Sequence, residues 1–157
     1  EPKALYNDPK AETKVPDDFE VPFGKARIRR EGQDLSVITY GNTLPMCLSV
    51  ADKIKEELNK DIEVIDLRSL LPLDEDTIIK SVKKTNRVLV VHEDKVFGGI
   101  GGEVAAIISD KAFSYLDAPV KRVGAKFTPI GFNRILEEAI LPDVEKILDG
   151  MKEVLEF

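Results

Sequence analysis

The sequence predicts one three-layer α/β/α domain, with a mainly parallel five-stranded sheet that carries one antiparallel edge strand. Short apolar runs alternate with amphipathic segments of about 10 to 15 residues, the pattern of βαβ units joined by right-handed crossovers. The 157 residues can bury one sizeable core, and 43% hydrophobic and 33% charged residues are ordinary for a globular domain. These observations predict a single domain.

The domain is expected to span residues 25–157, after an extended linker over residues 1–24. The linker contains four prolines and little apolar periodicity. Because the chain begins with Glu1 and not Met, we expect either a further domain of the same polypeptide or a processed leader upstream of the linker.

The first two strands are expected to form a hairpin. The segment KARIRR at 25–30 alternates in polarity, Gly32 marks a turn, and the apolar segment 35–40 enters the core. The first arm of this hairpin would be the antiparallel edge of the sheet.

The remaining elements follow from periodicity and from charge at helix ends. The acids at 74–76 open a helix that lysines close, which suits the helix dipole at both ends. The expected helices are 44–58, a helix opened at 74, 102–115 and 144–155, and the expected strands are 62–67, 87–91 and 119–123.

The net charge limits the class of binding partner, and the cysteine count limits the compartment and the kinds of cross-link. A net charge of −6 and a pI near 5.0 argue against nucleic acid or an anionic membrane and favour a basic partner. No apolar run approaches the ~20 residues that span a bilayer. The single Cys47 excludes an intramolecular disulfide and a cysteine-built zinc site, and it indicates a reducing, intracellular compartment.

A glycine-rich loop between a strand and a helix is the first candidate site. Gly98, Gly99, Gly101 and Gly102 could let backbone N–H groups approach an anion at a helix N-terminus. Their spacing matches neither GxGxxG nor GxxxxGK[ST]. The loop also lacks Lys, Ser and Thr, so close packing is the favoured role and an anion site at Gly98–Glu103 is the alternative.

His92 is the only histidine and the only candidate for a proton shuttle. It follows a buried strand, with Glu93 beside it, at the edge where α/β sheets bind ligands. The sequence has no nucleophile elbow, and Cys47 lies on an apolar helical stripe. A structural role for His92 is therefore favoured over catalysis.

Two charged residues flank Leu67 at the end of a strand. Alternation places Asp66 and Arg68 on the same face, where an ion pair is favoured over a substrate clamp. The scattered carboxylates and one histidine indicate no metal site.

Several segments together resemble the C-terminal domain of transketolase-like thiamine-diphosphate enzymes, in particular the β subunit of the E1 component of 2-oxo acid dehydrogenases. From about residue 20 to the end, the order and spacing of the segments match this family. They are GKARIRREGQDLSVITYG, VIDLRSLLPLD, RVLVVHEDKVFGGIGGEVAA, LDAPVKRVGAKFTPIGF and LPDVEKILDGMKEVLEF. The segment DLRSLLPLD is the most specific of them. The segment HEDKVFGG resembles the branched-chain type slightly more than the pyruvate type.

The resemblance implies a part of a larger enzyme. In that family, thiamine diphosphate lies between an α-subunit domain and the upstream pyrimidine-binding domain of the β subunit, and this sequence contains neither. No catalytic, cofactor-binding or metal residue is therefore assigned. The coenzyme and Mg²⁺ are expected in the intact enzyme, and this chain alone is expected to be inactive.

The role that the resemblance implies is assembly. The partners would be the E1 α subunit, a second β subunit, and the basic peripheral-subunit-binding domain of the E2 acyltransferase. Carried onto this sequence, the E2-docking residues are Asp117 and the terminal carboxylate of Phe157. Their alternative roles are a turn residue and a frayed end.

Two other functions stay open at this stage. One is a stand-alone domain that binds a small anion or metabolite at Gly98–Glu103, and the other is a small enzyme that uses His92 with Glu93. The expected location is the cytoplasm, or the mitochondrial matrix in a eukaryote. The sequence leaves the 2-oxo acid open.

Overall fold

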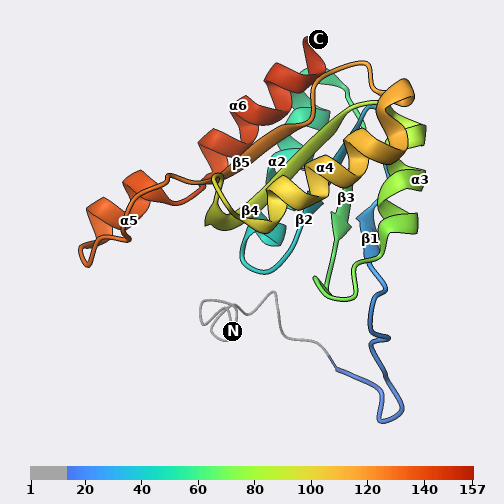
Figure 1. Ribbon diagram of the computed structural model, residues 1–157, viewed down its shortest axis with the longest axis horizontal. Coiled ribbons are helices and arrows are strands. Elements are labelled where there is room, and N and C mark those ends of the chain that lie inside the picture. The colour runs from blue at the N-terminus through green and yellow to red at the C-terminus, as the bar shows by residue number, and fades with distance from the viewer. Residues whose placement is uncertain (1–13) are drawn as a thin grey trace.

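The computed structural model describes residues 14–157, so the first 13 residues of the expected linker lie outside the described part. The sheet has five strands in the order β1-β3-β2-β4-β5 (Figure 1). All neighbouring pairs are parallel except β1 with β3. The predicted fold class is confirmed. The strands are β1 (Arg27–Arg30), β2 (Leu35–Thr39), β3 (Ile62–Asp66), β4 (Val88–Lys95) and β5 (Lys121–Ala125).

Helices cover both faces of the sheet (Figure 1). One hydrophobic cluster packs α2 and α6 on one face, and a second packs α3 and α4 on the other. Alternate strand residues enter opposite clusters, as the period of a strand requires. The helices are α2 (Thr43–Leu58), α3 (Glu75–Thr85), α4 (Ile100–Ala112), the 3-10 turn η2 (Phe113–Tyr115), α5 (Arg134–Ile140) and α6 (Val144–Leu155).

The predicted hairpin is wrong, although its first arm is the antiparallel edge strand as expected. β1 pairs with β3, through Ile28 opposite Ile65, and β2 lies on the far side of β3. The reason is burial: every residue of β2 is buried, so this strand belongs in the middle of the sheet. Gly32 does not lie in a hairpin turn. It lies where the chain passes over the start of β3, and a Cβ at Gly32 would lie 2.2 Å from the Glu63 backbone nitrogen.

Three element boundaries differ from the expectation. β4 continues to Lys95, so His92 lies inside the strand, and α4 begins at Ile100. β5 begins at Lys121, after Pro119, which has no N–H group to donate to the ladder. The short helix α5 has no counterpart in the sequence prediction.

The topology gives the sheet two distinct ends. The carboxyl edge, where the parallel strands end, carries the loops after β4 and β5. The amino edge, where those strands begin, carries the turn before β5 and the C-terminal end of α6 (Figure 1). An ion pair between Lys121 at the start of β5 and Glu153 near the end of α6 joins the two segments at the amino edge.

Candidate functional sites

The imidazole of His92 is fully buried between two glycines. A Cβ at Gly101 would lie 2.1 Å from Nε2, and one at Gly124 would lie 2.9 Å from Cε1. Neither ring nitrogen has a hydrogen-bond partner within residues 14–157. Burial lowers the pKa of His92, and the nearby charge of Arg122 lowers it further against the opposing effect of Asp94. A neutral, enclosed ring suits packing better than proton transfer.

Glu93 points away from His92. Its carboxylate accepts hydrogen bonds from Asn42 Nδ2 at 3.0 and 3.1 Å, and successive strand residues face opposite sides of a sheet. The geometry therefore does not bring the two residues together as an acid–base pair.

Close packing accounts for most of the glycine loop. A Cβ at Gly99 would lie 2.2 Å from the Lys95 carbonyl oxygen, and Gly101 packs on His92. Gly98 has a φ of +77°, in the left-handed region that favours glycine. Gly102 lies beside Arg122, whose Nη1 donates to the Val96 carbonyl oxygen at 2.9 Å. These contacts favour the packing role, and the anion site stays a prediction.

The expected ion pair between Asp66 and Arg68 is wrong. Within the described residues their side chains form no ion pair; the Arg68 backbone N–H donates to Asp66 Oδ1 at 3.2 Å instead. β3 ends at Asp66 and Arg68 has a left-handed φ of 58°, so the strand alternation that would put both side chains on one face does not extend to Arg68. Burial raises the pKa of Asp66.

Residues 14–157 contain no reactive cysteine and no metal-binding cluster. Cys47 is buried, and burial raises the pKa of its thiol to about 12, so it stays protonated and inert. In the part of the chain that the structure describes, no group of three or more His, Cys, Asp or Glu residues could hold a metal ion. Over the same range, no helix is both long and apolar enough to cross a membrane.

Asp117 lies at the amino edge, on the segment that leads from η2 to β5. Its backbone N–H donates to the Asn86 carbonyl oxygen at 2.8 Å, and Asn86 Nδ2 donates to the Tyr115 carbonyl oxygen at 2.6 Å. Its carboxylate faces Arg87, with Nη1 3.4 Å from Oδ2, and the Asp117 side chain is 58% exposed. Sequence reasoning missed Asn86 and Arg87, although Asn after a lysine-rich helix end is a typical C-cap.

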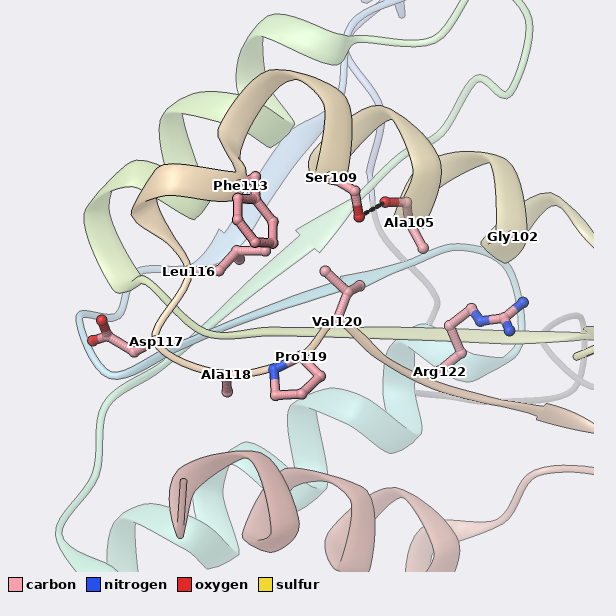
Figure 2. A pocket seen from close by; sticks show the side chains of 10 residues that line it. All are labelled: Gly102, Ala105, Ser109, Phe113, Leu116, Asp117, Ala118, Pro119, Val120 and Arg122. Carbon is pink, nitrogen blue, oxygen red and sulfur yellow. Dashed lines mark hydrogen bonds between the residues drawn. The ribbon is translucent and has the colours of Figure 1, made fainter.

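A surface groove of about 670 Å³ lies next to Asp117, between α4 and the segment before β5 (Figure 2). Its lining is mainly apolar, with Asp117 toward one end and Arg122 toward the other (Figure 2). The groove is lined by Gly102, Ala105, Ser109, Phe113, Leu116, Asp117, Ala118, Pro119, Val120 and Arg122.

Phe157 follows α6 and is exposed. The C-terminus lies at the amino edge, as does the segment between η2 and β5 that contains Asp117 (Figure 1). The structure thus places both predicted docking residues at one end of the sheet.

The segment between β5 and α6 forms an apolar arm, defined here as residues 126–141, which projects from the carboxyl edge (Figure 1). Helix α5 in this arm has no buried residue. The base of the arm is closed by a hydrogen bond of 3.1 Å from Lys126 N–H to the Ile140 carbonyl oxygen. The exposed large apolar side chains of the arm are Phe127, Ile130, Phe132, Ile135 and Leu136.

The arm continues onto the loop after β4. The rings of Phe97 and Phe127 meet edge to face, with centroids 4.7 Å apart, and Phe97 is itself exposed. Sequence reasoning missed this surface because the arm has no helical stripe that faces a core. Its concentration of Phe and Ile without polar alternation was the available signal.

Comparison with known proteins identifies the family. The family model described as transketolase, C-terminal domain, matches residues 24–147. The chain belongs to this family. A structure described as a split-gene transketolase, inactive beta4 tetramer, has the same fold, with a TM-score of 0.76 and 24% identity, over 90% of this chain and 45% of that one.

Curated relatives of this transketolase C-terminal domain include several E1 β subunits. The pyruvate dehydrogenase E1 component subunit beta of Rickettsia felis is 43% identical over 89% of this chain and 43% of its own length. The mitochondrial 2-oxoisovalerate dehydrogenase subunit beta of Dictyostelium discoideum is 37% identical over 100% of this chain and 42% of its own.

A third relative has a different named substrate. The acetoin:2,6-dichlorophenolindophenol oxidoreductase subunit beta of Bacillus subtilis is 40% identical over 99% of this chain and 44% of its own length. The chain therefore spans less than half the length of these relatives. It is homologous to the C-terminal domain of E1 β subunits.

Proposed function

We propose that this chain is the assembly and docking part of the thiamine-diphosphate-dependent E1 component of a 2-oxo acid dehydrogenase complex. The whole enzyme would oxidatively decarboxylate pyruvate or a branched-chain 2-oxo acid. Similarity to pyruvate and 2-oxoisovalerate dehydrogenase β subunits supports this proposal. The mitochondrial names of eukaryotic relatives support the matrix as the location if the source is a eukaryote, and otherwise the cytoplasm.

Thiamine diphosphate and Mg²⁺ would be bound outside this chain. The described residues fit the coenzyme poorly, because Gly99 packs on Lys95 and Gly101 on His92, and the glycine loop has no Lys, Ser or Thr to contact a diphosphate. They also contain no group of metal-binding side chains for the Mg²⁺ ion. The catalytic groups would therefore belong to the E1 α subunit and the upstream part of the β subunit.

The apolar arm is the observation that carries the assembly role. A helix of seven residues is marginal in water without tertiary contacts, and α5 buries none of its side chains. Soluble proteins rarely leave an apolar patch of this kind uncovered. The E1 α subunit and the second β subunit are the proposed partners that cover it.

Docking of E2 is proposed at the other end of the domain. The net charge of −6 attracts a basic module, and Asp117 and Phe157 lie at the same exposed edge. The alternative, an anion-binding module at Gly98–Glu103, has less support because three of the four glycines make close contacts inside the protein.

Assembly can be tested with the double variant Phe132→Ser, Ile135→Ser in the intact β subunit, co-expressed with the E1 α subunit. Both side chains are exposed, so the domain should keep its fold while the heterotetramer dissociates. Light scattering after gel filtration would measure the mass, and thermal unfolding would check the fold. Phe113→Ser, an exposed phenylalanine outside the arm, is the control and should assemble normally. A heterotetramer of unchanged stability in the double variant would refute the role of the arm.

A further inference from the structure

We propose that Arg87 attenuates E2 docking, because its guanidinium lies beside the Asp117 carboxylate and competes for it with a cationic group of the partner. This inference rests on the proposed docking at Asp117. In this inference, Arg87 competes with the partner for the Asp117 carboxylate. The partner would present a cationic side chain to Asp117 and an apolar side chain to the groove beside it.

Hydrogen bonds fix the backbone of Arg87, and burial restricts its side chain. Its carbonyl oxygen accepts hydrogen bonds from Ser36 N–H at 2.9 Å and from Thr85 Oγ1 at 3.1 Å. The side chain is only 27% exposed, and Nε is buried with no hydrogen-bond partner in the described part of the chain. The guanidinium therefore has little freedom to move away from the amino edge.

The contact between Arg87 and Asp117 is loose. The distance of 3.4 Å from Nη1 to Oδ2 exceeds the roughly 2.7–2.9 Å of a strong charge-assisted hydrogen bond. Exposed ion pairs of this kind contribute little to stability. A partner could therefore take over the carboxylate at low cost to the fold, but it would meet the positive charge of Arg87 there.

Asn86 keeps Asp117 in place independently of Arg87. Asn86 adopts a left-handed conformation, with a φ of 59°, and it accepts from Asp117 N–H and donates to the Tyr115 carbonyl oxygen. The position of the carboxylate thus follows from backbone contacts to Asn86. Removal of the Arg87 charge should change the electrostatics at Asp117 and leave its position unchanged.

Besides Arg87, two further cations lie near the groove and the segment before it. Lys83 lies over the Tyr115 ring, 4.8 Å from its centroid, and Arg122 lies toward the far end of the groove (Figure 2). The groove surface next to Asp117 is apolar, with Phe113, Leu116 and Pro119 (Figure 2). A partner that fits both features places a cation on Asp117 and an apolar side chain in the groove.

Binding of the isolated E2 peripheral-subunit-binding domain to the assembled E1 enzyme would test this inference by calorimetry. We expect Arg87→Gln to bind about two- to fivefold more tightly at low salt, an advantage that shrinks as salt screens the charge. Asp117→Asn should weaken binding. Adding Arg87→Gln to Asp117→Asn should then give no gain, because the competitor has lost its target.

Lys53→Gln is the matched control, since it changes the net charge equally but removes a lysine that pairs with Glu57 on α2, away from the groove. Only the effect of Arg87→Gln beyond that of Lys53→Gln supports the proposal. Equal or weaker binding by Arg87→Gln, with Asp117→Asn still harmful, would overturn this inference and leave the docking proposal intact. Unchanged binding by Asp117→Asn would overturn the docking proposal and, with it, this inference.

Discussion

At the scale of single residues, the position of His92 in the chain was predictable from the sequence, but its contacts were not. Its attachment to a buried strand and the spacing of the glycine loop were predictable from the sequence, but β4 continues past His92 to Lys95. The contact of Gly101 and Gly124 with opposite sides of the ring was not predictable, because it joins β4, α4 and β5 across the fold. Close packing alone can therefore explain why a polar ring such as His92 is buried near the edge of a sheet, without a catalytic role.

The lowered pKa of His92 predicts acid sensitivity. The unfolded chain takes up a proton near the ordinary pKa of 6.5, whereas the buried ring resists protonation until a lower pH. The free energy of unfolding should therefore decrease as the pH falls below about 6.5. Urea unfolding at a series of pH values would measure this slope, and NMR of the imidazole would give the pKa directly. An imidazole that titrates at or above the ordinary value in the folded protein would contradict the prediction.

At the scale of elements, the helix termini were the most predictable feature. The acids before α3 and the lysines at its end appear as expected, and Asp74 is its N-cap. The pairing of β1 was mispredicted because partner choice in a sheet depends on burial of distant strands. The helix of the arm was missed because periodicity detects only helices that face their own core.

Asp74 should contribute more than an ordinary cap. Its carboxylate accepts from Thr77 N–H at 3.2 Å and Thr77 Oγ1 at 2.9 Å, and also from Ala26 N–H at 3.0 Å, just before β1. Burial opposes its ionisation, but these hydrogen bonds outweigh burial and hold the pKa of Asp74 below its usual value.

We expect Asp74→Ala to lower the free energy of unfolding by about 1–2 kcal/mol, as measured in urea at pH 7. Asp76→Ala, at an exposed position in the same helical turn, is the control and should change stability by less than about 0.5 kcal/mol. Equal losses in the two variants would show that the cap bonds to Thr77 and Ala26 do not matter.

At the scale of the whole molecule, the sequence supported both the α/β/α fold and the family. The strand–helix alternation and the DLRSLLPLD block depend on local residues, and both agree with the structure and the comparisons. The groove beside Asp117 depends on how α4 and the segment before β5 meet, so no local pattern reveals it. The apolar content of the arm is visible in the sequence, but its exposure is not, because exposure depends on the position of the core.

The chain by itself should not bind the coenzyme tightly. The proposed diphosphate and pyrimidine sites belong to other parts of the enzyme, and the described residues lack a metal-binding group. Calorimetric titration of this chain with thiamine diphosphate and Mg²⁺ should give no binding in the micromolar range. The assembled E1 enzyme is the positive control. A micromolar dissociation constant for the chain alone would contradict the proposed division of labour.

The antiparallel direction of β1 decides at which end of the sheet the polypeptide enters the domain. Because β1 runs against its neighbours, the polypeptide enters the domain at the edge that also bears the apolar arm. In the proposed assembly, the upstream connection and the subunit contacts would both use this end of the sheet, and the opposite end, with Asp117 and Phe157, would stay accessible to E2. E2 would then bind and dissociate there without any change in the proposed subunit contacts at the apolar arm.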